Sequence, residues 1–102
     1  MKYVTNKAEL EESLSGITLV KFGADWCGPC KHLLPIFDKL QQINKDVNFI
    51  SVNIEFSQDL VSEFNINKIP IVLVFKNKEL KKTIGGYNTY IFYQDIIDEY
   101  KK

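Results

Sequence analysis

The sequence contains no apolar run approaching the roughly 20 residues that a membrane-spanning helix needs. It also has no excess of charge, because thirteen basic residues balance thirteen acidic ones. This balance provides no electrostatic attraction to nucleic acid or to an anionic membrane, so neither is expected as a partner. The first residues turn polar at once and lack the apolar stretch of a secretory signal, so we expect a cytoplasmic protein.

Cysteine and histidine are scarce, with two cysteines, Cys27 and Cys30, and one histidine, His32. In the cytoplasm thiols are kept reduced and structural disulfides are rare, so the pair is expected to be catalytic or metal-binding. Zinc usually takes four ligands, and the chain has no third cysteine. We expect no metal site and place His32 on the surface, with a structural zinc site or a structural disulfide as the alternatives.

The length and composition fit a single domain covering residues 1–102, since 45% of the residues are hydrophobic and 13% are aromatic. Apolar patterning predicts strands at residues 2–5, 17–22, 48–54, 71–75 and 79–84, and helices at 6–13, 27–44, 57–64 and after 86. Asn6 and Ser57 are the expected N-caps of the first and third helices.

The order of these elements predicts an α/β fold. Helical crossovers between strands require parallel pairing, whereas the two-residue turn Asn77–Lys78 requires an antiparallel hairpin. A mixed central β-sheet of about five strands, flanked by about four helices, satisfies both requirements. The lysine-rich strand at 79–84 is expected at an edge of this sheet.

The two cysteines stand between a predicted strand and a predicted helix, in the run Cys27-Gly28-Pro29-Cys30. A helix N-terminus stabilises a thiolate, which is the form that attacks a disulfide. Cys27 is therefore the expected nucleophile. Cys30 lies one helical turn further in and is expected to resolve the mixed disulfide. Pro29 restricts the backbone, so the two sulfurs are held near bonding geometry.

Other short motifs accompany this run, and they are Trp26-Cys27-Gly28-Pro29-Cys30-Lys31, Pro35, Lys68-Ile69-Pro70-Ile71, Phe75-Lys76-Asn77 and Gly85. With them the chain resembles the thioredoxin family over nearly its whole length. The resemblance implies the thioredoxin fold and a thiol–disulfide oxidoreductase that reduces protein disulfides. It implies no bound cofactor, because the dithiol is itself the redox centre. The implied partners of a monomeric chain are a thioredoxin reductase, by default an NADPH-dependent flavoprotein, and disulfide-containing target proteins.

The resemblance also implies a substrate surface around Cys27. Its expected members are Trp26, Gly28, Pro29, Ile69, Pro70 and Gly85. The Ile69–Pro70 bond is expected to be cis and to face the cysteines, with an ordinary trans proline as the alternative. Trp26 is as well explained by half-buried packing, and Gly85 by a tight passage from strand to helix.

Two positions depart from the family pattern. Lys21 stands where the family usually has a buried Asp, and Ser51 where it often has the accompanying Lys. Gly23 replaces an aromatic residue, most often Trp. Burial disfavours a charged lysine, so we expect Lys21 near Cys30 either to stabilise thiolates when charged or to accept the Cys30 proton when neutral. The alternative is that its long stem carries the ammonium out to water.

Two other functions remain open at this point. The chain is a more oxidising disulfide exchanger if the departures at Lys21 and Gly23 retune the dithiol. It is a thioredoxin-fold binding or structural module if its redox activity is incidental, since fold alone does not determine function. The intact pair with Gly28 and Pro29 favours the reductase.

Overall fold

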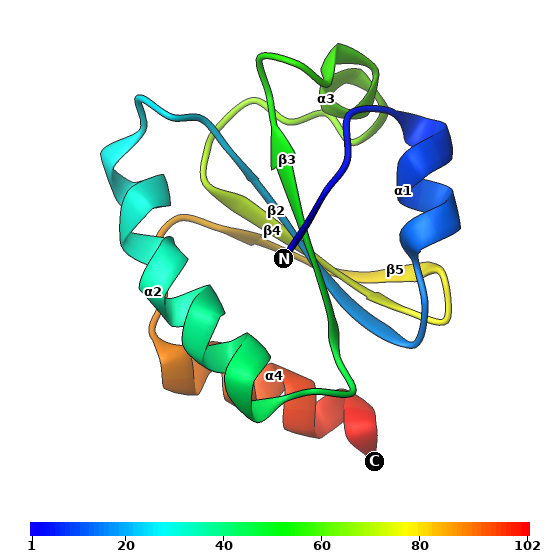
Figure 1. Cartoon of the computed structure of the whole chain (residues 1–102), viewed down its shortest axis with the longest axis vertical. Coiled ribbons are helices and arrows are strands. Elements are labelled where there is room, and N and C mark those ends of the chain that lie inside the picture. The colour runs from blue at the N-terminus through cyan, green and yellow to red at the C-terminus, as the bar shows by residue number, and fades with distance from the viewer.

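A five-stranded sheet in the order β1-β3-β2-β4-β5 forms the centre of the molecule (Figure 1). The structure is a computed structural model that describes all residues 1–102. The elements are β1 (Lys2–Tyr3), α1 (Lys7–Ser13), β2 (Ile17–Gly23), α2 (Gly28–Ile43), β3 (Asn48–Asn53), α3 (Gln58–Glu63), β4 (Ile71–Lys76), β5 (Glu79–Gly85) and α4 (Tyr90–Lys101).

The sheet is mixed, as the connections predicted. β3 runs parallel to both β1 and β2, whereas β4 runs antiparallel to β2 and β5. The hairpin between β4 and β5 turns at Asn77 and Lys78, whose φ angles are 52° and 71°. Two consecutive residues with positive φ produce the tight turn whose twist matches the flanking strands. β5 lies at the edge, where its lysines were expected.

Helices cover both faces of the sheet (Figure 1). α2 and α4 lie on one face, and α1 and α3 lie on the other. Every residue of β2 is buried, because the strand is paired on both sides and covered on both faces. Its odd-numbered residues face α2, as the packing of Leu19 with Leu33 and Phe37 shows. This alternation turns Lys21 and Gly23 toward the same helix.

The N-caps of α1 and α3 and the length of β1 agree only in part with the predictions. Asn6 caps α1 as predicted, accepting a hydrogen bond from the backbone N–H of Glu9 at 2.9 Å. Ser57 is the N-cap residue of α3, as predicted, but its side chain makes no capping hydrogen bond. Its hydroxyl instead donates to the carbonyl of Val4 at 3.5 Å and connects α3 to the first segment. β1 is shorter than predicted, and ends at Tyr3.

Candidate active site

The two cysteines form a disulfide at the point where β2 leads into α2. Cys27 is the N-cap of α2, and Cys30 lies in its first turn, with 5.2 Å between the two Cα atoms. The Sγ of Cys27 accepts a hydrogen bond from the backbone N–H of Cys30 at 3.2 Å. The positive end of α2 therefore faces this sulfur and stabilises negative charge on it after reduction.

Apolar residues surround the disulfide and leave it little exposed. Cys27 is 7% exposed and Cys30 is 4% exposed. Ala24 joins them in a small cluster, against which Ile54 and Ile69 pack. Sequence reasoning identified Ile69 but missed Ala24 and Ile54. The available signal was that each directly follows a buried strand, β2 or β3.

The structure places the expected surface residues around this cluster. Trp26 is 66% exposed, so the indole is not half-buried as the alternative explanation required. Gly28 and Pro29 are exposed beside it, and Ile69 packs against the cysteines. The Ile69–Pro70 peptide bond is cis, as expected. Trp26, Gly28 and Pro29 thus adjoin the disulfide in the chain, and Ile69 packs against it.

Gly85 reaches the same region from β5. It pairs with Ile71 in the sheet, and the N–H of Gly86 donates to the carbonyl of Pro70 at 2.9 Å. Gly86, with φ 79°, adopts the left-handed conformation that the strand-to-helix passage needs. A Cβ on Gly85 would meet nothing within 4 Å. The backbone conformation between β5 and α4 therefore favours a glycine at position 86, whereas neither backbone nor space requires one at position 85.

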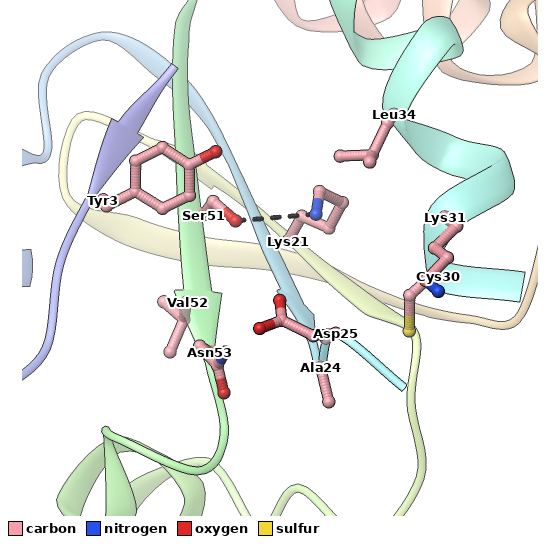
Figure 2. Close-up of a pocket in the computed structure, with 11 residues that line it drawn as sticks. Tyr3, Lys21, Ala24, Asp25, Cys30, Lys31, Leu34, Ser51, Val52 and Asn53 are labelled. Carbon is pink, nitrogen blue, oxygen red and sulfur yellow. Dashed lines mark hydrogen bonds between the residues drawn. The ribbon is translucent and has the colours of Figure 1, made fainter. Parts of the chain in front are cut away.

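A cavity of about 370 Å³ opens between the sheet and α2 (Figure 2). Cys30 forms part of its wall, and Cys27 does not. Three other wall residues stand level with one another across neighbouring strands, because Tyr3 pairs with Ser51 and Ser51 pairs with Lys21. The cavity therefore extends from Lys21 on β2 and Ser51 on β3 to Cys30.

The side chain of Lys21 ends inside the protein. The residue is 5% exposed, so its stem does not carry the ammonium to the outer surface. Its Nζ has one hydrogen-bond partner, the Oγ of Ser51 at 3.5 Å. The three ion pairs of the structure join other residues. Burial lowers the pKa of Lys21 from its ordinary value of 10.5, because the low-dielectric interior penalises the charged form.

Gly23 lies close to the sulfur of Cys30. A Cβ at this position would stand 3.2 Å from the Sγ of Cys30 and 3.3 Å from its Cβ. The absence of a side chain at Gly23 therefore lets the end of β2 pack tightly against Cys30. His32, by contrast, is exposed on α2, as expected, and its ring lies 6.4 Å from that of Tyr87.

No group of three or more His, Cys, Asp and Glu side chains comes together in an arrangement that could hold a metal ion. None of the helices is long and apolar enough to cross a membrane.

Comparisons with known proteins agree with this geometry. The thioredoxin family model matches residues 2–99. A thioredoxin of Mycoplasmoides gallisepticum is 44% identical over 88 residues, which are 83% of this chain and 88% of that protein. Among solved structures, a mutant thioredoxin from Halobacterium salinarum has a TM-score of 0.92 at 27% identity, with 99% of this chain and 90% of that one covered. Oxidised mitochondrial thioredoxin 3 from Saccharomyces cerevisiae has a TM-score of 0.87 at 29% identity, with 96% and 94% covered.

These likenesses and the Cys27–Cys30 disulfide together show a thiol–disulfide oxidoreductase that reduces protein disulfides. Reductases and disulfide-containing targets are the partners that this family implies in general. The chain belongs to the thioredoxin family.

Proposed function

We propose that Cys27 is the nucleophile and Cys30 the resolving cysteine of protein-disulfide reduction. The Cys27 thiolate attacks one sulfur of the target disulfide, and the other target sulfur leaves as a thiolate. The Cys30 thiolate then attacks the Sγ of Cys27, which releases the second target thiolate and re-forms the Cys27–Cys30 disulfide. Two electrons pass from the dithiol to the target. The position of Cys27 at the N-cap of α2 is the observation that carries this assignment.

The substrate surface of this reaction surrounds Cys27. An exposed indole at Trp26 and the exposed backbone at Gly28 and Pro29 supply an apolar area on one side. Ile69, Pro70 and Gly85 supply the other side. An extended target segment pairs with the backbone ahead of Pro70 and brings its disulfide to Cys27.

Lys21 controls the proton of Cys30 in this proposal. Both residues line one cavity, and no carboxylate pairs with the lysine there. Neutral Lys21 accepts the proton of Cys30, either directly or through water in the cavity. Protonated Lys21 stabilises the thiolate that results. Lys21 is thus a positioning and charge-tuning residue rather than one that touches the target.

The wider setting follows from the same chemistry. The dithiol needs an electron donor, which we assign to a thioredoxin reductase of the flavoprotein class, and it needs no bound cofactor. Residues 1–102 act as one domain and as a monomer. The cytoplasm is the proposed compartment, because its thiol pool keeps a dithiol of this kind reduced.

Single substitutions of the two cysteines test the assignment. Cys27→Ser is expected to abolish reduction of a protein disulfide such as that of insulin. Cys30→Ser is expected to keep the first step and to accumulate one covalent target adduct per chain, detectable by mass spectrometry. Adducts on Cys27→Ser, or steady turnover by Cys30→Ser, would reverse the two roles.

A further inference from the structure

The buried amine of Lys21 faces a carboxylate across the cavity. Asp25 is the only acidic residue in the cavity wall, and Figure 2 shows its carboxylate directed toward Lys21. No ion pair joins the two side chains, since the three ion pairs of the structure join other residues. The two groups therefore oppose each other across the cavity without direct contact between the charged atoms.

A turn between β2 and α2 gives Asp25 this position. The backbone N–H of Cys27 donates to the carbonyl of Ala24 at 3.2 Å, so Asp25 and Trp26 are the two central residues of the turn. The side chain of Trp26 is exposed beside Cys27, whereas that of Asp25 lines the cavity. Because the turn ends at the N-cap of α2, it holds the carboxylate close to the redox centre.

The cavity is large and polar enough to hold water between the two groups. Its volume is about 370 Å³, and one water molecule needs roughly 10–15 Å³ of such space. Ser51 and Asn53 add polar side chains to the wall and offer hydrogen bonds to this water. Asp25 is exposed and Lys21 is buried, so the carboxylate lies on the solvent side of the lysine.

Three other titratable side chains line the cavity, and none of them favours a charged lysine. Lys31 on α2 is exposed, and its positive charge opposes protonation of Lys21. Tyr3 on β1 carries no charge near neutral pH, and Cys30 is part of the disulfide in the oxidised chain. β3 contributes no titratable side chain to the wall. Asp25 is therefore the one group around the cavity whose charge favours the ammonium form of Lys21.

We propose that Asp25 is the counter-ion of Lys21, a positioning residue that favours the protonated form of the lysine and acts through it on Cys30. The proposal rests on the role assigned above to Lys21, which exchanges a proton with Cys30. That exchange leaves an ammonium on Lys21 and a thiolate on Cys30, while Asp25 keeps its negative charge throughout. Water weakens the attraction, so most of the cost of burying the ammonium stays uncompensated.

Titration of Lys21 in the native, oxidised chain tests the pairing. The ¹³Cε signals of the lysines are followed by NMR across the alkaline range, and the Lys21 signal is assigned by its loss in Lys21→Met. Asp25→Asn is expected to lower the Lys21 pKa by about half a pH unit, because an opposite charge that favours the ammonium is lost. Asparagine suits the turn as well as aspartate does, so the backbone is expected to stay in place.

Two further variants separate the carboxylate from general effects of charge. Asp25→Glu keeps the negative charge and is expected to retain most of the native Lys21 pKa. Asp38→Asn is the matched control, since Asp38 is also exposed but lies on α2 outside the cavity. It is expected to leave the Lys21 pKa unchanged. No change in Asp25→Asn, or an equal change in Asp38→Asn, would overturn the proposal.

A second titration tests whether Asp25 acts on Cys30 through Lys21. The ¹³Cβ signal of Cys30 is followed in the reduced chain, with and without Asp25→Asn, in the native and the Lys21→Met backgrounds. Loss of the carboxylate favours the thiolate directly, but a less protonated lysine stabilises that thiolate less. We therefore expect Asp25→Asn to lower the Cys30 pKa in the Lys21→Met background, and to lower it less or raise it when Lys21 is present. Equal shifts in both backgrounds would contradict an action through the lysine.

The two titrations also separate this proposal from the role assigned to Lys21. The Lys21 pKa of the oxidised chain depends on Asp25 whether or not the lysine takes the proton of Cys30. A Cys30 pKa that Lys21→Met leaves unchanged would refute the role of the lysine, whereas an unchanged Lys21 pKa in Asp25→Asn would refute the counter-ion.

Discussion

Lys21 is the residue at which this chain departs furthest from the apolar character of its own strand. Its neighbours Val20 and Phe22 are fully buried, and Lys21 itself is 5% exposed. A weak hydrogen bond to Ser51 does not replace the water that a protonated amine loses on burial. Burial of the Lys21 amine therefore lowers the stability of the fold next to its redox centre.

The first prediction is that Lys21→Met stabilises the oxidised protein. Its free energy of unfolding is expected to rise by roughly 1–3 kcal/mol near neutral pH, because an uncompensated buried charge is removed. The folded chain has a lowered Lys21 pKa, so between that value and 10.5 the unfolded chain binds more protons. The native chain therefore gains stability with rising pH in that window, and the advantage of the variant shrinks.

Denaturant unfolding of both chains across this pH range measures the effect. The difference between the two chains isolates Lys21 from the other titrating groups. Lys82→Met serves as the control, since that side chain lies on β5 outside the cavity. A variant that is less stable than the native chain at neutral pH would mean that Lys21 is well solvated in the cavity.

Much of this site could be predicted at the residue scale, because its signals are local. Cys27, Cys30 and the cis Ile69–Pro70 bond were identified from short motifs, and the structure packs Ile69 against the two cysteines. The burial of Lys21 was open, because snorkelling and burial are equally consistent with an apolar strand. The cavity could not be foreseen. It depends on the register of three strands and on the space that remains between them and α2.

At the scale of elements, a pair of amide side chains connects α2 to α4. The Nδ2 of Asn44 donates to the Oε1 of Gln94 at 2.7 Å, and the Nε2 of Gln94 donates back to the Oδ1 of Asn44 at 3.0 Å. Asn44 is 2% exposed and also donates to the carbonyl of Leu40 at 2.9 Å. One side chain thus ends α2 and fixes the position of α4 against it.

The second prediction concerns this amide pair. Asn44→Ala is expected to lower the free energy of unfolding by roughly 1–3 kcal/mol, because buried partners lose their hydrogen bonds. Gln94→Ala is expected to cost less, since that side chain is only partly buried. The double variant is expected to cost less than the two changes added, with a coupling of about 0.5–2 kcal/mol. A double-mutant cycle in urea measures this, and strictly additive losses would exclude the coupling.

The elements themselves were predictable, and their long-range contacts were not. Apolar periodicity and turn residues identified the helices and the strands within a few residues. Ser57 lies at the predicted N-cap position, but the partner of its hydroxyl was not predictable, because a serine before a helix can bond the helix or another segment. Its contact with the carbonyl of Val4 depends on a segment 53 residues away. The Asn44–Gln94 pair, separated by 50 residues, likewise has no local signal.

At the scale of the whole molecule, burial is concentrated in the middle of the sheet. β2 and β4 lie between other strands and under helices on both faces, whereas β1 has two residues, both exposed. Opening β2 requires the removal of both covering layers. The stability of the molecule is therefore expected to fall from the centre of the sheet to its edges.

The third prediction is that the amides of Leu19 to Phe22 exchange with deuterium only through global unfolding. Their exchange free energies are expected to equal the global value and to fall with added denaturant in parallel with it. The amides of Lys2 and Tyr3 are expected to exchange far earlier. Native-state exchange measured by NMR at several sub-denaturing concentrations checks this. Exchange of the β2 amides that is insensitive to denaturant would show a separate local opening.

The exposed indole beside the disulfide has a practical consequence. Trp26 is the sole tryptophan of the chain, is 66% exposed, and adjoins Cys27. Because the chain has no second tryptophan, no other indole contributes to the emission of the protein. The fluorescence of this single indole is therefore expected to differ between the disulfide and the dithiol forms, so that the redox state can be followed without an attached label.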